Sequence, residues 1–333
     1  GEKARSVTDV VPSNDNGNDN AETLGPAEAL DAPSARVETP ASSGRALIEA
    51  RGLRIDRDGS PEVDRLSFAT KASPKNGVLV LGAPHGLFEA AAGLVKPAAG
   101  ELLIKGEPAF EAAQSSKVAG AAASMPLPDK WTLERYVTWS ARLGGATKAM
   151  ASVGAHRAIS RLDLREHADT PFEKTPPHVR ILAPLAAALA TGAETLVIED
   201  PLTTLPSDHA RDLARRMLAA LEDRRWVFFA GKIAPGAPFA LAADEAVVVG
   251  GNRVVQGGVV DLAAREGTYA VRIHGEARTF ARLVGSSGGT TRGDGDDLLV
   301  DLGATLHTRD LFDLADQAHS VIVELRPLSR AFV

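Results

Sequence analysis

Two short segments carry residue types that could bind a phosphate group or a metal ion. The first is the glycine-containing loop Gly82–Gly86, which follows the apolar run Val78–Leu81 and precedes a helical pattern that begins at Leu87. The free N–H groups at the start of a helix attract anions. The second is the acidic pair Glu199 and Asp200, directly after the apolar run Leu196–Ile198. Carboxylate oxygens are ligands that magnesium accepts.

The elements around these segments predict a parallel sheet. The runs Val78–Leu81, Leu196–Ile198 and Trp226–Ala230 are short and almost entirely apolar, as is typical of strands buried on both faces. The amphipathic segment Ser207–Leu221 lies between the second and third runs and predicts a helix. Together these segments form a βαβ unit, so we expect an α/β fold.

The composition excludes several classes of protein. The 333 residues are 44% hydrophobic and 24% charged, which is ordinary for a globular protein with an ample core. The chain has no cysteine, so disulfides, thiolate metal sites and cysteine catalysis are excluded. No apolar stretch approaches the roughly 20 residues of a membrane span, so we expect no direct membrane insertion. No secretion-signal pattern is visible near Gly1.

The net charge of −6 is concentrated at the N-terminus. Residues 1–44 hold eight acidic and three basic residues, whereas the rest of the chain holds 35 and 34. Without a basic excess, the sequence indicates no nucleic-acid partner. Residues 1–44 also lack aromatic residues and are rich in Asn, Asp, Ala and Pro, so we expect a disordered tail.

Seven segments in the right order resemble the ATP-binding subunits of ABC transporters. The helical pattern after Gly82–Gly86 contains Ala92-Gly93-Leu94 followed by Pro97, as in that family. The other matching segments are Glu49–Leu53, Val63–Phe68, Gly100–Gly106, Thr132–Glu134, Leu196–Pro201 and Asp244–Gly258. The resemblance implies a P-loop NTPase-like nucleotide-binding fold with a helical subdomain.

The phosphate-binding loop of that family is altered in this chain. The resemblance implies that the loop should supply a lysine for the phosphates and a hydroxyl for magnesium. Here the five residues are Gly82, Ala83, Pro84, His85 and Gly86, and the loop is about four residues short. We interpret it as a vestigial loop whose Pro84 and Gly86 serve a tight turn. His85 has no identifiable partner in the sequence, so we expect a surface loop residue.

The other positions that the resemblance implies are also changed. Glu199 and Asp200 stand in the Walker B position in inverted order, which favours a vestigial pair over a working one. The signature motif aligns with four residues of which two are prolines and so lack N–H groups: Thr175, Pro176, Pro177 and His178. These prolines suit a plain helix start, and Pro184 should kink the helix that follows.

Lys232 occupies the position of the family's switch histidine. It could replace the cation that the phosphate loop has lost, although a solvated loop lysine is the simpler interpretation. We predict no metal site and no firmly bound cofactor. Weak binding of Mg-ATP at the helix N-terminus near Leu87 is left open.

The patterns divide the chain into a tail and two folded parts. We expect a tail over 1–44 and a nucleotide-binding-like domain over 45–260, with its helical subdomain at about 131–190. A small α+β accessory domain is expected over 268–333, with strands near Tyr269–Ile273, Leu298–Leu302 and Val321–Leu325 and helices at 277–284 and 308–318. This part resembles the C-terminal extension of exporter-type ABC subunits.

Three functional hypotheses follow. The first is a pseudo-ATPase that serves as a structural or regulatory subunit of a transport complex. It would pair with an ABC-type homologue and a transporter membrane subunit, in the cytoplasm at the inner face of the membrane. The second is a divergent ATPase that uses Glu199, Asp200 and Lys232. The third is a soluble scaffold that no longer takes part in transport.

Overall fold

The computed structural model describes residues 45–71, 77–263, 267–293, 295–303, 305–327 and 331. The chain divides into residues 1–41 and residues 42–333, and every described residue belongs to the second unit. The tail predicted over 1–44 therefore lies outside the described residues. No helix in the described ranges has both the length and the apolar character that a membrane span requires.

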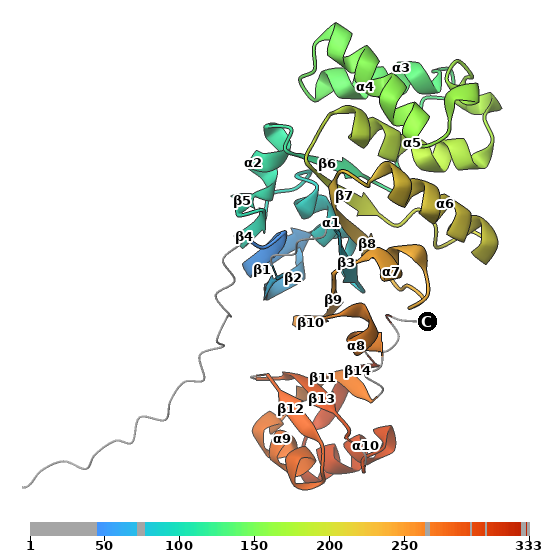
Figure 1. Cartoon of the computed structure of the whole chain (residues 1–333). Helices are drawn as coiled ribbons and strands as arrows, with labels where there is room; N and C mark the ends of the chain where they lie inside the picture. The colour runs from blue at the N-terminus through green and yellow to red at the C-terminus, as the bar shows by residue number, and fades with distance from the viewer. Residues whose placement is uncertain are drawn as a thin grey trace, which may run out of the picture. The chain divides into compact units, whose positions relative to one another are not determined.

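A six-stranded sheet forms the centre of the fold (Figure 1). Its order is β10-β9-β3-β8-β7-β6, in which β10 alone is antiparallel to its neighbour. The strands are β3 (Gly77–Leu81), β6 (Val118–Ala121), β7 (Thr195–Glu199), β8 (Arg225–Ala230), β9 (Glu245–Gly250) and β10 (Arg253–Gly257). The predicted parallel βαβ unit is confirmed: β7 and β8 are parallel neighbours joined by α6 (Ser207–Ala220).

Successive side chains of each apolar strand point to opposite faces of this sheet. A separate hydrophobic core covers each face. In β3, Leu79 and Leu81 pack into one hydrophobic cluster, whereas Val78 and Val80 pack into the other. The first cluster also contains the buried faces of α3 (Leu133–Leu143), α4 (Lys148–Arg161) and α5 (Pro177–Ala190). Two short 3₁₀ helices, η1 (Arg165–His167) and η2 (Phe172–Lys174), connect α4 to α5. The prediction that residues of about 131–190 are mainly helical agrees with these elements.

The second cluster lies under an antiparallel sheet of order β2-β1-β4-β5. The strands are β1 (Ile48–Arg57), β2 (Ser60–Ala69), β4 (Ala99–Ile104) and β5 (Glu107–Pro108), and the helices are α1 (His85–Ala91) and α2 (Ala109–Gln114). Helix α1 corresponds to the helical pattern predicted from Leu87, whereas α2 was not predicted. The short helices α7 (Pro238–Ala242) and α8 (Val259–Ala263) flank β9 and β10 in the sequence.

The C-terminal part has its own sheet and its own core. The sheet order is β12-β13-β11-β14, and one hydrophobic cluster joins it to the two helices. The elements are β11 (Thr268–His274), α9 (Ala277–Ser286), β12 (Thr290–Arg292), β13 (Asp297–Asp301), α10 (Thr308–Gln317) and β14 (Val321–Pro327). The five predicted elements are present and β12 is additional. The position of the domain boundary between residues 260 and 268 stays a prediction.

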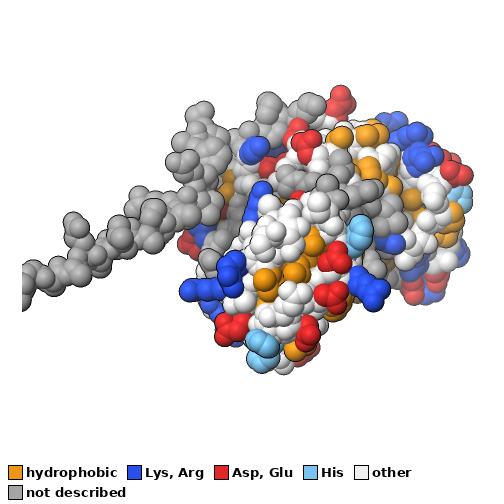
Figure 2. Space-filling view, turned by 90° about the horizontal axis from the view of Figure 1, so that it is seen from below, with side chains coloured by type: hydrophobic (Ala, Val, Ile, Leu, Met, Phe, Trp, Pro, Cys, Tyr) orange, Lys and Arg blue, Asp and Glu red, His pale blue; other side chains and the backbone are white. Residues whose placement is uncertain are grey.

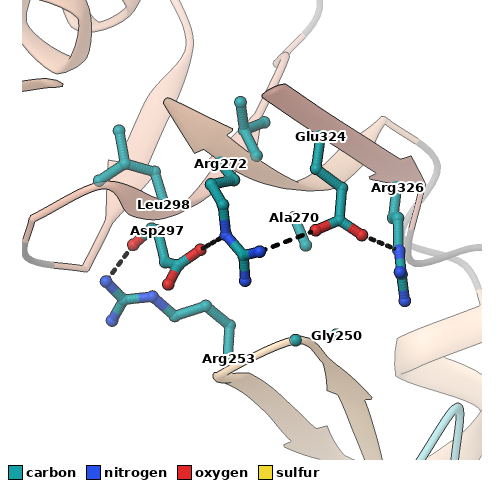
Figure 3. Close-up of a pocket in the computed structure, with 10 residues that line it drawn as sticks. Gly250, Arg253, Ala270, Arg272, Asp297, Leu298, Glu324 and Arg326 are labelled. Atoms are coloured by element: carbon teal, nitrogen blue, oxygen red, sulfur yellow. Dashed lines mark hydrogen bonds and ion pairs between the residues drawn. The ribbon is translucent and has the colours of Figure 1, made fainter. Parts of the chain in front are cut away.

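An arginine–carboxylate network lines a small hollow between β10 and this sheet (Figure 3). Arg253 donates to the backbone oxygen of Asp297, and the Asp297 carboxylate accepts from Arg272 Nε at 2.8 Å. Glu324 pairs with both Arg272 and Arg326. Each carboxylate thus contacts a guanidinium inside the network, so we interpret this cluster as structural.

The described surface near α9 and α10 that Figure 2 shows mixes apolar and charged side chains. In the view from the lower side of Figure 1, hydrophobic side chains form small groups between acidic and basic ones (Figure 2). Phe312 of α10 is the exposed large apolar side chain on these two helices. Isolated apolar groups of this kind are normal on a protein surface.

Candidate functional site

The loop after β3 uses its backbone to close a tight strand-to-helix turn. Gly82 has a positive φ of 66°, and a Cβ there would stand 2.8 Å from the Val249 oxygen, so glycine is required. The Gly82 N–H donates to the Ala230 oxygen at 3.0 Å, and the Leu87 N–H donates to the Pro84 oxygen at 3.0 Å. Pro84 has no N–H. Of the loop's four backbone N–H groups, that of Gly82 is therefore engaged within the protein.

Helix α1 begins at His85, two residues earlier than the sequence predicted. Pro84 is its N-cap, and no side chain caps the helix. Gly86 lies in the first turn, where a Cβ would come within 2.3 Å of Glu62 Oε2 and 3.2 Å of Ile55 Cγ2. The interpretation of Pro84 as a backbone element thus fits the geometry, whereas Gly86 is needed for close packing against β1 and β2.

His85 contacts the acidic residue at the end of β7. Its Nδ1–H donates to Glu199 Oε1 at 2.5 Å, although 114 residues separate the two in the sequence. The second carboxylate oxygen, Oε2, accepts the Ala123 N–H at 2.9 Å. His85 is at the surface, as expected, with 39% of its side chain exposed, but it begins α1 rather than lying in the loop, and it has a partner in Glu199 that the sequence did not reveal.

The sheet order explains how these residues meet. β3 and β7 both pair with β8, one on each side, so their ends lie about 10 Å apart, two strand spacings. The helix start after β3 carries the imidazole across this interval. A carboxylate with one methylene less than glutamate would reach less far, so Glu rather than Asp at position 199 suits this contact.

Further charged side chains extend the cluster toward β1 and β2. His85 Nε2 lies 3.4 Å from a Glu89 oxygen, one turn along α1. Glu89 also pairs with Arg57 of β1, whose Nε lies 3.5 Å from Glu62 Oε2. The cluster thus connects β1, β2, α1 and β7 through side chains, and the segment after β6 through the backbone N–H of Ala123.

Asp200 faces a less polar environment than Glu199. Its Oδ1 accepts the Leu202 N–H at 2.7 Å, so it caps the turn after β7. Burial raises the pKa of this carboxyl, the negative charge of Glu199 raises it further, and the Leu202 hydrogen bond opposes the shift. The two acids predicted as a pair therefore have separate structural roles.

The described residues do not suit a magnesium ion at this place. Both Glu199 oxygens are engaged by His85 and Ala123, and an Asp200 oxygen is engaged by Leu202. Magnesium requires several oxygen ligands in near-octahedral geometry. No group of three or more acidic or histidine side chains in the described ranges could hold a metal ion.

The segment aligned with the signature motif forms the start of α5. Pro176 is the N-cap and Pro177 is the first helical residue, as proline suits this position. The Thr175 N–H and hydroxyl both turn back to the Phe172 oxygen, at 3.2 and 2.9 Å. Two prolines and one internally bonded N–H leave few donors for an external phosphate. α5 continues through the buried Pro184.

His178 packs beside a second histidine. Its ring centroid is 5.6 Å from that of His167. Burial lowers the pKa of His178, and positive charge at His167 and Arg216 lowers it further. The sequence reasoning did not connect these two histidines, which come from η1 and α5.

Lys232 is exposed in the loop after β8. In the part of the chain that the structure describes, it makes no ion pair with Glu199 or Asp200. The contact that would make it a substitute cation is therefore not formed in this conformation.

The sequence did not reveal the contributions of Arg57, Glu89 and Ala123 to the site. Of these three, Glu89 alone had a signal in the sequence, which is its helical i,i+4 spacing from His85.

Comparisons with known proteins place these features in context. No model of a known protein family matches the chain. Among curated proteins, the hemin import ATP-binding protein HmuV of Streptomyces coelicolor is 28% identical over 233 residues, which is 60% of this chain and 80% of HmuV.

Solved structures show the same fold at low identity. cbiO1 of Clostridium perfringens, part of the ABC transporter complex cbiONQ, is 16% identical with a TM-score of 0.55, covering 66% of this chain and 91% of cbiO1. MJ1267, an ATP-binding cassette of an ABC transporter, is 12% identical with a TM-score of 0.53, covering 65% and 94%. An inward-facing putative metal-chelate type ABC transporter is 14% identical with a TM-score of 0.53, covering 80% and 99%.

These matches establish the architecture. The chain has the fold of ABC nucleotide-binding domains, as the sequence predicted. The match to HmuV, together with this fold, indicates homology to ATP-binding subunits of ABC transporters.

Proposed function

We propose that this chain is a non-hydrolysing homologue of ABC transporter ATP-binding subunits and acts as a structural or regulatory subunit of a transport complex. One observation carries the proposal: Glu199, at the position of a metal-binding acid, has both oxygens occupied by His85 and Ala123. A magnesium ion at Glu199 would therefore have to compete with two internal hydrogen bonds for these oxygens.

The surrounding loop supports the same conclusion. Charge on a transferred phosphate is normally stabilised by a lysine, by backbone N–H groups and by a magnesium ion. Here the loop has no lysine, Pro84 has no N–H, and the Gly82 N–H donates to Ala230. The segment Thr175–His178 adds little donor capacity, since two of its residues are prolines and Thr175 bonds to Phe172.

The setting of a transport complex is supported by the relatives. HmuV is named as an import ATP-binding protein, and cbiO1 is part of a transporter complex. By analogy, the partners of this chain would be an ABC-type homologue and a transporter membrane subunit, at the inner face of the membrane. The direction of transport and the exporter-type character of the C-terminal part stay predictions.

The test is binding and hydrolysis of Mg-ATP by the full chain. Ligand at 100 times its Kd stabilises a protein by about 2.7 kcal/mol, which shifts the unfolding midpoint by several degrees. We expect no shift and no heat of binding at millimolar Mg-ATP, and no phosphate release above the buffer rate. The matched variant Lys232→Ala should behave in the same way.

A clear shift in the wild type would overturn the proposal. If Lys232→Ala or Glu199→Gln then abolished that shift, the divergent-ATPase hypothesis would take its place. A chain that binds neither nucleotide nor the permease encoded near its gene would favour the scaffold hypothesis.

A further inference from the structure

Two histidines from different elements meet at the start of α5. His167 is the last residue of η1 and His178 is the second residue of α5, and their ring centroids lie 5.6 Å apart at an interplanar angle of 67°. The His167 side chain is 18% exposed, and His178 is partly buried. Because histidine changes its charge between about pH 5 and 8, the electrostatic character of this contact depends on pH.

Positive groups act on His178 from three directions. His167 lies on η1, Arg216 lies on α6, and the start of α5 has a partial positive charge from its free N–H groups. Helix α5 packs against both α4 and α6 (Figure 1). The first turn of α5 holds no acidic residue and has no side-chain cap. Arg180, two residues further along α5, contacts Asp129 at 3.5 Å.

The nearby carboxylates contact other cations. Glu166 Oε1 lies 3.3 Å from His167 Nε2, and 79% of the Glu166 side chain is exposed. Asp163, in the segment after α4, lies 3.8 Å from a nitrogen of Arg216. An exposed carboxylate stabilises a neighbouring positive charge only weakly, because water screens the interaction. The surroundings therefore favour the neutral form of the His178 ring.

Burial and positive charge together lower the pKa of His178. Burial is the largest cause, the charges of His167 and Arg216 follow, and Glu166 opposes them. The folded protein therefore holds this proton less tightly than the unfolded chain does. The stability that depends on the neutral ring is complete above the ordinary pKa of 6.5, and it is lost as pH falls through the lowered pKa.

The segment that packs on His178 is held by single turns of backbone. Within residues 165–175, the N–H groups of four residues donate to oxygens three positions earlier, at 3.0 to 3.2 Å: His167, Ala168, Thr170 and Thr175. Short 3₁₀ turns have poorer hydrogen-bond geometry than an α-helix. Segments of this kind open at low free energy, whereas α5 is buried over most of its length. The segment 165–175 is therefore the part that a charge on His178 can release.

We propose that His167 and His178 form a pH-sensitive switch, which holds segment 165–175 on the start of α5 at neutral pH and releases it in mild acid. At neutral pH the two rings contact each other. Protonation of both rings places two positive charges beside the positive end of α5, and the contact becomes repulsive. The inference is independent of the proposed function, because it involves neither nucleotide nor a partner.

A switch fits this pair better than a metal site. Imidazoles ligate zinc, but a zinc ion in a protein takes at least three protein ligands. No group of three or more acidic or histidine side chains in the described ranges could hold a metal ion. The positive charge of Arg216 and the start of α5 also oppose the binding of a cation beside His178.

The first measurement is the titration of the histidine rings in the full chain. NMR of isotope-labelled histidine follows each ring from about pH 5 to pH 8 in buffer with EDTA, and the signal missing from His178→Gln identifies His178. We expect its midpoint below 6.5. Arg216→Gln should raise this midpoint, because it removes one opposing charge. A midpoint at or above 6.5 would overturn the inference.

Hydrogen exchange with mass spectrometry measures the release itself. After correction for the intrinsic rate at each pH, exchange in residues 165–175 should rise severalfold between about pH 7.5 and pH 5.5. His178→Gln cannot take up the charge and should lose this rise. His178→Lys is charged throughout this range and should exchange fast already at neutral pH.

A matched control separates the pair from histidines in general. His209→Gln removes an exposed histidine from the neighbouring α6 and should keep the wild-type response to pH. If His178→Gln is not folded by circular dichroism, His167→Gln takes its place. This variant removes the partner ring, so its rise in exchange should be smaller than that of the wild type.

Three results of the exchange experiment would overturn the inference. The first is exchange in residues 165–175 that does not change with pH. The second is a rise in acid that persists unchanged in His178→Gln or, where that variant is unfolded, in His167→Gln. The third is a rise spread evenly over the chain, which would indicate general acid unfolding rather than a local switch.

Discussion

Two polar regions of this protein differ in whether their charged side chains are paired. They are the cluster around His85 and the outer face of α3. In the first, His85, Glu199, Glu89 and Arg57 contact one another. In the second, Arg135 and Arg142 stack on Trp131 and Trp139 and have no acidic partner in the described ranges. A region whose charges are satisfied internally has little to offer a ligand.

The first region lies at the carboxyl ends of β3 and β7, and the second is the exposed side of a helix. Breaking contacts in the first region should reduce the stability of the fold. Breaking them in the second should change stability much less. Mutations can test each half of this statement.

The largest effect is expected for the His85–Glu199 contact. Glu199→Ala removes two hydrogen bonds and should lower the free energy of unfolding by about 2 kcal/mol, because bonds to a charged acceptor are strong but this one is partly exposed. His85→Ala removes one bond and should lower it by about 1 kcal/mol. Urea unfolding of both single variants and the double variant gives the coupling energy, expected at about 1 kcal/mol.

A coupling near zero would show that the two side chains do not stabilise each other in solution. Glu199→Gln is the matched control for this cycle. Its amide oxygen can still accept the Ala123 N–H while its NH2 group faces the His85 ring, so its loss should be smaller than that of Glu199→Ala.

A smaller effect, dependent on pH, is expected at Asp200. Because burial raises its pKa in the folded state, the folded protein holds this proton to higher pH than the unfolded chain does. The ionised carboxyl therefore lowers stability as pH rises above the ordinary value of 3.8. Asp200→Asn keeps the acceptor for Leu202 and removes this penalty. Its unfolding midpoint, relative to wild type, should rise with pH and then level off.

Thermal unfolding of Asp200→Asn across pH 4 to 8 gives this difference. Asp208→Asn, which removes an exposed carboxylate from the first turn of α6, is the matched control for a general change in net charge. A flat difference for Asp200→Asn would contradict the burial of its charge.

The smallest effect on stability is expected on the α3 face. Arg135→Gln and Arg142→Gln should each lower the free energy of unfolding by about 0.5 kcal/mol, because exposed cation–π contacts contribute little. Urea unfolding measures this directly. A loss well above 1 kcal/mol for either variant would mean that the arginine serves the fold, and the contrast between the two regions would disappear.

Much of the architecture could be predicted from local patterns. Continuous apolar runs such as Trp226–Ala230 indicated buried parallel strands, and the structure confirms them in the central sheet. The two prolines at 176 and 177 indicated a helix start, which α5 has. The short elements α2 and β12 were missed because six and three residues give too little periodicity for a prediction.

The candidate site was less accessible to sequence reasoning. The absence of a lysine and a hydroxyl after β3 was visible in the sequence. The interpretation of His85 failed because its partner is 114 residues away, and no local rule connects a loop residue to a strand end at that distance. The pairing of Arg57 with Glu89, 32 residues apart, was hidden for the same reason.

The sequence by itself determined the strands and the main helices, because these depend on neighbours within a few positions, and it showed directly that Gly82–Gly86 contains no lysine and no hydroxyl residue. Only the tertiary structure decided which charges meet. The order β3-β8-β7 brings His85 to Glu199, whereas the packing of α3 leaves Arg135 and Arg142 without a carboxylate in the described ranges. The physical reason is that an ion pair requires two side chains within a few ångströms, and for distant residues the fold alone sets that separation.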